Sequence, residues 1–213
     1  MDDDGAERVV LVAAERLSGW LTRFEARHGT SSATATASEV ALIAPDGAGA
    51  VIEVPFPPLA APEEPRSVVE HALLDRTVGA VLVRRGGYAV GWFTGRTLVG
   101  SKVGSTYVQG TTKAGGWSQQ RYARRRANQT TQAYAEAADV VATLLLPHVN
   151  DLTAVVGGGD KVGVHAVLAD PRLGGLRNLL RPRVLPTPDP RLRVLQAFGD
   201  QLREVRITLN ALG

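Results

Sequence analysis

The sequence has no cysteine, and this absence excludes several chemistries at once. A chain of 213 residues without cysteine holds no disulfide, thiol nucleophile, iron–sulfur cluster or cysteine-ligated zinc site. No apolar run approaches the roughly 20 residues that cross a bilayer. The first residues, Met1–Asp4, are acidic, whereas a secretory signal begins with basic and then apolar residues. We therefore expect a cytoplasmic protein without a membrane partner, built on one sizeable core or a core plus a smaller unit.

Acidic residues are missing from a long central stretch. Residues 76–135 contain 10 basic and no acidic residues, whereas residues 1–75 contain 13 acidic and 5 basic ones. The remaining residues, 136–213, are nearly balanced, with 8 acidic and 9 basic. Such asymmetry indicates that the middle of the chain meets a polyanion. The alternative is a basic surface that serves solubility only.

The N-terminal third predicts a small unit of mixed structure. Apolar residues at three- and four-residue steps predict a helix over residues 6–27, followed by a loop over residues 30–38. Two apolar runs around Pro45-Asp46-Gly47 predict a hairpin of residues 40–44 and 50–55. Five prolines between residues 55 and 65 resemble a linker. The predicted division is therefore an extension of residues 1–58 and a main domain of residues 66–213.

The main domain predicts strands first and a long helix next. After a short helix near residues 67–74, glycine turns separate strands predicted at 80–83, 88–93, 98–102 and 106–109. The longest apolar stripe predicts a helix from residue 118 to residue 146, stopped by Pro147. The remaining residues predict a strand at 152–156, a short helix or strand at 160–169, a strand at 183–185 and a closing helix at 191–212. These elements predict an α/β fold with a mixed, largely antiparallel sheet and flanking helices.

One segment combines glycines, neutral amides and arginines. Gly115-Gly116 allows backbone conformations and close approaches that are closed to other residues. Trp117, Gln119 and Gln120 follow at the junction between this loop and the long helix. The arginines of the first helical turns are Arg121, Arg124, Arg125 and Arg126, with Lys113 in the preceding loop.

This arrangement suits a phosphate backbone. Arginine binds phosphate bidentately, and the positive end of the helix dipole adds to the same field. Trp117 is a candidate for stacking on a base or ribose. The alternative is a solvated basic helix face with the tryptophan in the core.

Residues 115–126, Gly-Gly-Trp-Ser-Gln-Gln-Arg-Tyr-Ala-Arg-Arg-Arg, carry a family resemblance. They resemble the loop and helix that contain the catalytic Gly-Gly-Gln of archaeal and eukaryotic class-one release factors. They are more closely similar to the Vms-like release factor (VLRF) family, in its small actinobacterial branch. The resemblance spans residues 66–213 and implies a release-factor-like catalytic domain.

The resemblance implies a peptidyl-tRNA hydrolase that releases nascent chains during ribosome rescue and quality control. Its partners would be the large ribosomal subunit, its RNA and peptidyl-tRNA, and no cofactor is implied. The residue directly after the glycine pair is Trp117, where the class-one release factors have glutamine. In the VLRF family the glutamine is displaced from the glycines, so the resemblance implies Gln119 as the first choice for the catalytic amide. Gln120 is the second choice and Gln109 the third. Gln109 otherwise joins the expected RNA-binding residues. A nuclease of the tRNA 3′ end and a non-catalytic ribosome- or RNA-binding module remain as alternatives.

Other chemical signals are weak. Gly157-Gly158-Gly159-Asp160-Lys161 follows a strand but lacks the spacing of a phosphate-binding loop, so a tight turn is expected. The four histidines are scattered without the spacing of metal ligands, and no metal site is predicted.

Overall fold

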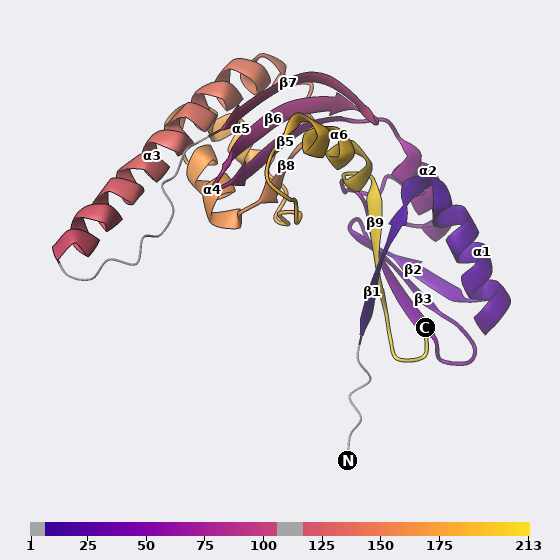
Figure 1. The fold of residues 1–213 in the computed structure, drawn as a ribbon. Helices are drawn as coiled ribbons and strands as arrows, with labels where there is room; N and C mark the ends of the chain where they lie inside the picture. The colour runs from indigo at the N-terminus through magenta and orange to yellow at the C-terminus, as the bar shows by residue number, and fades with distance from the viewer. Residues whose placement is uncertain (1–6, 106–116) are drawn as a thin grey trace. The chain divides into compact units, whose positions relative to one another are not determined.

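The computed structural model describes residues 7–105 and 117–213, and for residues 117–128 it describes the backbone alone. The chain divides into two compact units (Figure 1). Unit 1 takes in the residues up to Leu74 together with Asp200–Gly213, and unit 2 consists of Asp75–Gly199. Unit 2 is therefore inserted into the sequence of unit 1.

Unit 1 contains a five-stranded sheet with the strand order β1-β9-β4-β3-β2, in which all neighbours are antiparallel. Its strands are β1 (Arg8–Ala13), β2 (Ser32–Ala35), β3 (Glu39–Ile43), β4 (Gly49–Glu53) and β9 (Glu204–Leu209), and its helices are α1 (Leu17–His28) and α2 (Val68–Leu73). Alternate residues of β9, such as Val205 and Ile207, are buried in one core with Leu17 and Phe24 of α1. The sheet thus has one face in the core.

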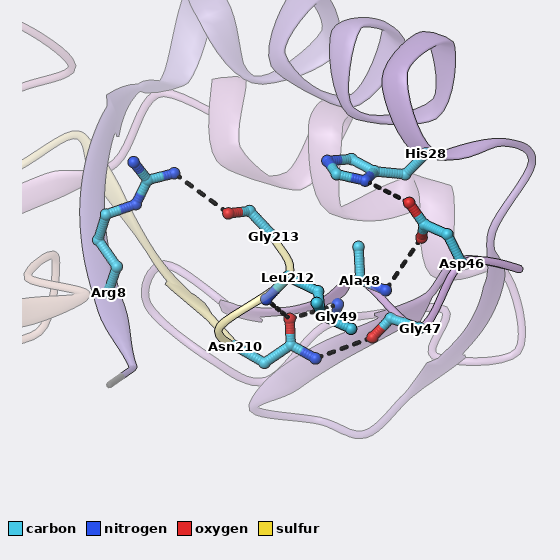
Figure 2. Close-up of polar contacts among 9 residues, drawn as sticks. All are labelled: Arg8, His28, Asp46, Gly47, Ala48, Gly49, Asn210, Leu212 and Gly213. Atoms are coloured by element: carbon cyan, nitrogen blue, oxygen red, sulfur yellow. Dashed lines mark hydrogen bonds and ion pairs between the residues drawn. The ribbon is translucent and has the colours of Figure 1, made fainter. Parts of the chain in front are cut away.

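The β3–β4 turn and the end of β9 are held together by side chains (Figure 2). Asp46 accepts hydrogen bonds from the backbone N of Ala48 at 3.0 Å and from Nδ1 of His28 at 2.8 Å. Asn210 accepts from the N of Gly49 and donates to the carbonyl of Gly47, each at 2.9 Å. Asn210 therefore ties the end of β9 to the turn that begins β4.

Unit 2 contains a four-stranded sheet with the order β7-β6-β5-β8. Its strands are β5 (Thr77–Arg84), β6 (Gly87–Thr94), β7 (Thr97–Ser105) and β8 (Ala154–Gly159), and its helices are α3 (Trp117–Leu145), α4 (Lys161–Leu168), α5 (Gly174–Asn178) and α6 (Leu192–Gln201). β5 and β8 are parallel, whereas β5–β6 and β6–β7 are antiparallel.

Helices lie against both faces of this sheet. Val81 and Val83 of β5 share a core with residues of α3, α4 and α5. On the opposite face, a Cβ on Gly91 would lie 2.9 Å from Leu195, and one on Gly158 would lie 3.2 Å from Phe198, so α6 packs closely there. Because both faces are covered, β5 is apolar from Val78 to Val83 without alternation.

Three sequence predictions are wrong, and all concern unit 1. The predicted helix over residues 6–27 begins as strand β1, and only Leu17–His28 is α-helical. The predicted loop over residues 30–38 contains β2, and the predicted closing helix over residues 191–212 ends at Gln201, after which the chain forms β9. In the two predicted helices, residues 6–27 and 191–212, the apolar residues fit a helical period. Residues 8–13 and 204–209 nevertheless form strands, because β1 and β9 pair with each other.

Most of the other predicted elements are confirmed. The β3–β4 and β5–β6–β7 hairpins, α2, α3 and β8 occupy the predicted positions within a few residues, and residues 160–169 form α4. The segment predicted as a strand at 183–185 forms one bridge, between Leu185 and Gly158. The predicted extended segment at 106–109 lies outside the described residues.

The α/β fold class with largely antiparallel sheets is confirmed. The division of the chain into residues 1–58 and 66–213 stays a prediction, and the two compact units differ from it by assigning α2 and β9 to unit 1. Among the helices that the structure describes, none combines the length and the apolar character needed to span a membrane.

Candidate nucleic-acid interface

Helix α3 joins the glutamine- and arginine-rich segment to the core of unit 2. In its C-terminal half, the buried side chains include Ala137, Ala138, Val141 and Leu145, which pack in the core under β5 and β6. Pro147 lies in the 3-10 turn that follows, because proline cannot continue the helical hydrogen bonding. The helix is thus anchored at its C-terminal half, and Figure 1 shows its N-terminal end extending past the sheet.

The predicted site residues divide into two groups. The first lies in the first three turns of α3, where the helical backbone is described and the side chains lie outside the described residues: Trp117, Gln119, Gln120, Arg121, Arg124, Arg125 and Arg126. The second lies in residues 106–116, wholly outside the described residues: Gln109, Lys113, Gly115 and Gly116. The roles assigned to both groups stay predictions.

The helical period of α3 relates positions 121 and 125, whose backbone alone is described, to residues further along the helix. At 100° per residue, positions 121 and 125 fall on the same side of a helix as Gln132 and on the side opposite to Val141. Gln132 is exposed and Val141 is buried. Positions 121 and 125 therefore belong to the side of α3 that faces away from the core of unit 2.

Two further arginines of the acid-free stretch lie elsewhere, at the end of β5. Arg84 donates through Nη1 to the carbonyl of Thr187 at 2.6 Å, and its Nε lies 3.7 Å from Oδ1 of Asp189. Arg84 and Arg85 line a cavity together with Thr187 and Asp189. Sequence reasoning counted both arginines as part of one basic block and missed Thr187 and Asp189, because no local pattern connects residues about 100 positions apart.

Two tyrosines, Tyr134 of α3 and Tyr88 of β6, have raised pKa values. Burial is the main cause for Tyr134, the charge of Asp160 raises its pKa further, and the charge of Arg85 acts in the opposite direction. Burial also raises the pKa of Tyr88, with Glu136 and Asp139 of α3 as lesser causes. Tyr134 therefore lies within electrostatic reach of two residues of the cavity at the end of β5.

In the described part of the chain, no group of three histidine, aspartate or glutamate side chains is placed to hold a metal ion. His71 is buried and bonds the carbonyl of Pro55 at 2.8 Å, and His148 packs against the ring of Trp92. These contacts are structural ones.

The sequence matches the family model described as "Actinobacteria/chloroflexi VLRF1 release factor" over residues 76–208, which is more than half of the chain. The chain belongs to this release factor family. The family resemblance that was inferred from residues 115–126 is therefore confirmed, and the matched region takes in both the Gly-Gly segment and the whole of α3. No curated protein matches the sequence.

The solved structures that are similar to this chain include three at low sequence identity. The archaeal translation termination factor aRF1 is 14% identical, with a TM-score of 0.47, over 76% of this chain and 51% of its own. A structure described as an archaeal protein is 13% identical, with a TM-score of 0.37, over 76% and 52%. Pelota from Archaeoglobus fulgidus is 11% identical, with a TM-score of 0.27, over 95% and 66%. The chain thus spans about half the length of the termination factor.

Proposed function

We propose that this protein is a peptidyl-tRNA hydrolase that releases nascent chains from stalled ribosomes or large ribosomal subunits in the cytoplasm. The carboxamide of Gln119 positions a water molecule against the ester carbonyl that joins the peptide to tRNA. Gly115 and Gly116 shape the loop, and the arginines of α3 hold ribosomal RNA or the acceptor end of the tRNA. The observation that carries the proposal is the family match, which includes this segment.

The chemistry asks little of the protein beyond positioning. A neutral amide enters an RNA-lined site without a charge that would have to be desolvated. It orients the attacking water and offers N–H donors to the oxyanion that develops on the carbonyl. In this reaction water adds to the ester carbonyl, the ester C–O bond breaks, and the proton of the water passes to the leaving 3′ oxygen of the tRNA. RNA groups around the ester supply the remaining contacts.

Charge distribution supports the same proposal. Unit 2 contains 17 basic and 7 acidic residues, so a large polyanion would be attracted to this unit. Four or five arginine–phosphate contacts would make binding depend on salt with a log–log slope of about −3. Salt dependence of that size is the expected mark of contacts to the RNA backbone.

The test is peptide release from purified stalled complexes that carry a labelled nascent chain. We expect Gln119→Ala to lower the single-turnover release rate by about 100- to 1,000-fold, the usual cost of one positioned donor. Gln132→Ala is the matched control, because Gln132 is an exposed glutamine of the same helix whose side chain donates a hydrogen bond to Glu136. The control should release peptide at the rate of the unchanged protein.

The outcomes separate the alternatives. Unchanged release by Gln119→Ala removes Gln119 from its role and directs the test to Gln120 and then to Gln109. Release with a tRNA that has lost its terminal nucleotides would identify a nuclease and contradict ester hydrolysis. Salt-dependent ribosome binding without any release would identify a non-catalytic binding module.

A further inference from the structure

A cavity lies at the carboxyl ends of β5 and β8, the parallel strands of the unit 2 sheet. It has a volume of about 710 Å³ and is lined by residues of both strand ends and of a later loop, among them Arg84, Arg85, Asp160, Thr187 and Asp189. In α/β proteins, ligands bind outside the carboxyl ends of parallel strands. The volume is that of a site for a ligand larger than an amino acid.

The charged groups in this cavity are mixed and incompletely paired. Arg84 holds the carbonyl of Thr187 and has only a long contact to Asp189, and both of these charged side chains are substantially exposed. Arg85 has no hydrogen bond or ion pair to any residue that the structure describes. Asp160 caps α4 by accepting from the backbone N of Val162 at 3.1 Å through Oδ1. Its second carboxylate oxygen has no hydrogen bond to any residue in the described ranges 7–105 and 129–213.

The hydroxyl of Thr187 is the observation that points to a ligand. Thr187 is only 6% exposed, and its Oγ1 is buried without a hydrogen-bond partner among the described residues. Burying a hydroxyl without a partner is unfavourable, and most buried polar atoms of folded proteins are paired. Thr187 lines the cavity, so a ligand group there would supply the missing partner once the side chain changes rotamer.

The three glycines of β8 need no ligand to explain them. A Cβ on Gly159 would lie 2.5 Å from the carbonyl oxygen of Val83, and its φ of +88° also favours glycine. A Cβ on Gly157 would lie 2.7 Å from a methyl group of Val164. Close packing therefore accounts for the glycine run, and the case for a ligand depends on the side chains alone.

The composition of the cavity limits the chemistry of its ligand. Arg84 and Arg85 suit a phosphate, which arginine binds through paired N–H donors. The carboxylates of Asp160 and Asp189 accept hydrogen bonds only, so they require donors such as the hydroxyl groups of a sugar. A simple anion satisfies the first pair and is repelled by the second. A ribonucleotide satisfies both, because its phosphate is anionic and its ribose carries two hydroxyl donors.

We propose that this cavity binds a ribonucleotide, with the phosphate at Arg84 and Arg85 and the ribose hydroxyls at Asp160 and Asp189. The hydroxyl of Thr187 gains a ligand partner. The nucleotide is either free or one unit of an RNA strand, and the chemistry of recognition is the same in both cases. Among the residues of α3, Tyr134 lies near enough for Asp160 and Arg85 to affect its ionisation.

The RNA source rests on the proposed function, whereas the site itself does not. Arg126 precedes Tyr134 by eight residues on α3, a rise of about 12 Å in an α-helix. An RNA strand held by the arginines at the start of α3 would therefore come within a few nucleotides of the cavity. A protein that binds nucleotides here but releases no peptide would contradict only the proposed function. A protein that releases peptide without binding them would contradict only this site.

The experiment measures binding of small probes to the full-length protein by backbone amide NMR and calorimetry. The probes are AMP, adenosine, dAMP, and eight-nucleotide RNA and DNA strands of one sequence. We expect AMP to shift the amide resonances of residues near 84–85, 159–162 and 187–189. AMP should bind about tenfold more tightly than adenosine, and also more tightly than dAMP. Arg85→Gln should weaken the binding of AMP about tenfold and leave the affinity for adenosine unchanged. The control, Arg177→Gln, removes an exposed arginine of α5 and should change neither.

Thr187→Val distinguishes a ligand role from a structural one. Because the Thr187 hydroxyl has no partner within the described structure, its removal should leave the thermal unfolding midpoint unchanged or raise it, while AMP affinity falls several-fold. Unchanged AMP affinity would contradict the role of Thr187.

The remaining outcomes distinguish a free nucleotide from an RNA strand, or contradict the proposed site. An RNA strand that binds tenfold tighter than AMP at these amides supports the RNA source, and AMP binding as tight as RNA supports a free nucleotide. The site is overturned if no probe shifts these amides or if Arg85→Gln and Arg177→Gln weaken binding equally. Equal affinity for AMP and dAMP overturns recognition of the ribose.

Discussion

The two units of this protein carry opposite charge and use their sheets differently. Unit 1 contains 14 acidic and 7 basic residues, whereas unit 2 contains 17 basic and 7 acidic ones. The sheet of unit 1 exposes Val9, Leu11 and Val51 on the face away from its core, whereas helices lie on both faces of the sheet in unit 2. The net charge of +3 hides this separation, and RNA contacts are therefore expected from unit 2 alone.

Side-chain truncations should show the largest difference, between positions on covered sheet faces in either unit and a position on the open face of the unit 1 sheet. Leu82→Ala in β5 and Ile52→Ala in β4 each remove a fully buried side chain and should lower the free energy of unfolding by about 3 kcal/mol. Val51→Ala removes a side chain that is 37% exposed and should cost less than about 1 kcal/mol. Chemical denaturation of the full-length protein measures all three. A Val51→Ala cost equal to that of Ile52→Ala would mean that the open face of unit 1 is covered in solution.

Removal of matched arginine pairs tests the charge difference. Arg124→Gln with Arg125→Gln should weaken RNA binding about tenfold or more and reduce the log–log salt slope by about 1.4, since each phosphate contact to a single strand contributes about 0.7. Arg23→Gln with Arg27→Gln removes two exposed arginines from α1 of unit 1 and should change neither quantity. Filter binding of labelled ribosomal RNA across a salt series gives both. Equal losses from the two pairs would contradict confinement of binding to unit 2.

The smallest effect concerns two carboxylates, one in each unit. Hydrogen bonds from Arg172 lower the pKa of Asp170 in unit 2 to about 2, and a hydrogen bond from Arg66 lowers the pKa of Glu25 in unit 1. Because the folded-state pKa of Asp170 lies below the ordinary value of 3.8, its charged form stabilises the fold above pH 3.8. This stabilisation is lost as the pH falls through about 2.

Carboxyl NMR titration measures these shifts. Arg172→Gln should raise the pKa of Asp170 toward its ordinary value and leave that of Glu25 unchanged, and Arg66→Gln should do the converse. A pKa of Asp170 that does not move in Arg172→Gln would contradict the assigned cause.

Local patterns predicted the parts of the fold that local contacts decide. The glycine turns between β5, β6 and β7 and the apolar stripe of α3 are visible within short windows, and both predictions are confirmed. Residues 8–13 and 204–209 were predicted as helix because their apolar residues fit a helical period as well as a strand. Their state depends on pairing between segments about 195 positions apart, which no window contains.

Sequence patterns likewise indicated the candidate site only where its residues are close together in the chain. The glycine, glutamine and arginine segment lies within about 20 consecutive residues, so its resemblance to a release factor family could be found from sequence. The cavity of unit 2 is assembled from the ends of β5 and β8 and from residues 186–189. Thr187 stands in a proline-rich segment whose sequence indicates only a loop, and its burial beside Arg84 follows from the fold.

The position of β9 has a consequence for the order in which the protein folds as it is synthesised. β9 lies between β1 and β4, so the sheet of unit 1 is missing an interior strand until residue 209 has been made. Unit 2 is complete ten residues earlier and can assemble first. Until then β1 lacks its partner, and the unpaired edges of β1 and β4 are open to pairing with other chains. A polypeptide truncated before residue 204 is accordingly expected to aggregate through its N-terminal strands even when its basic unit is fully folded.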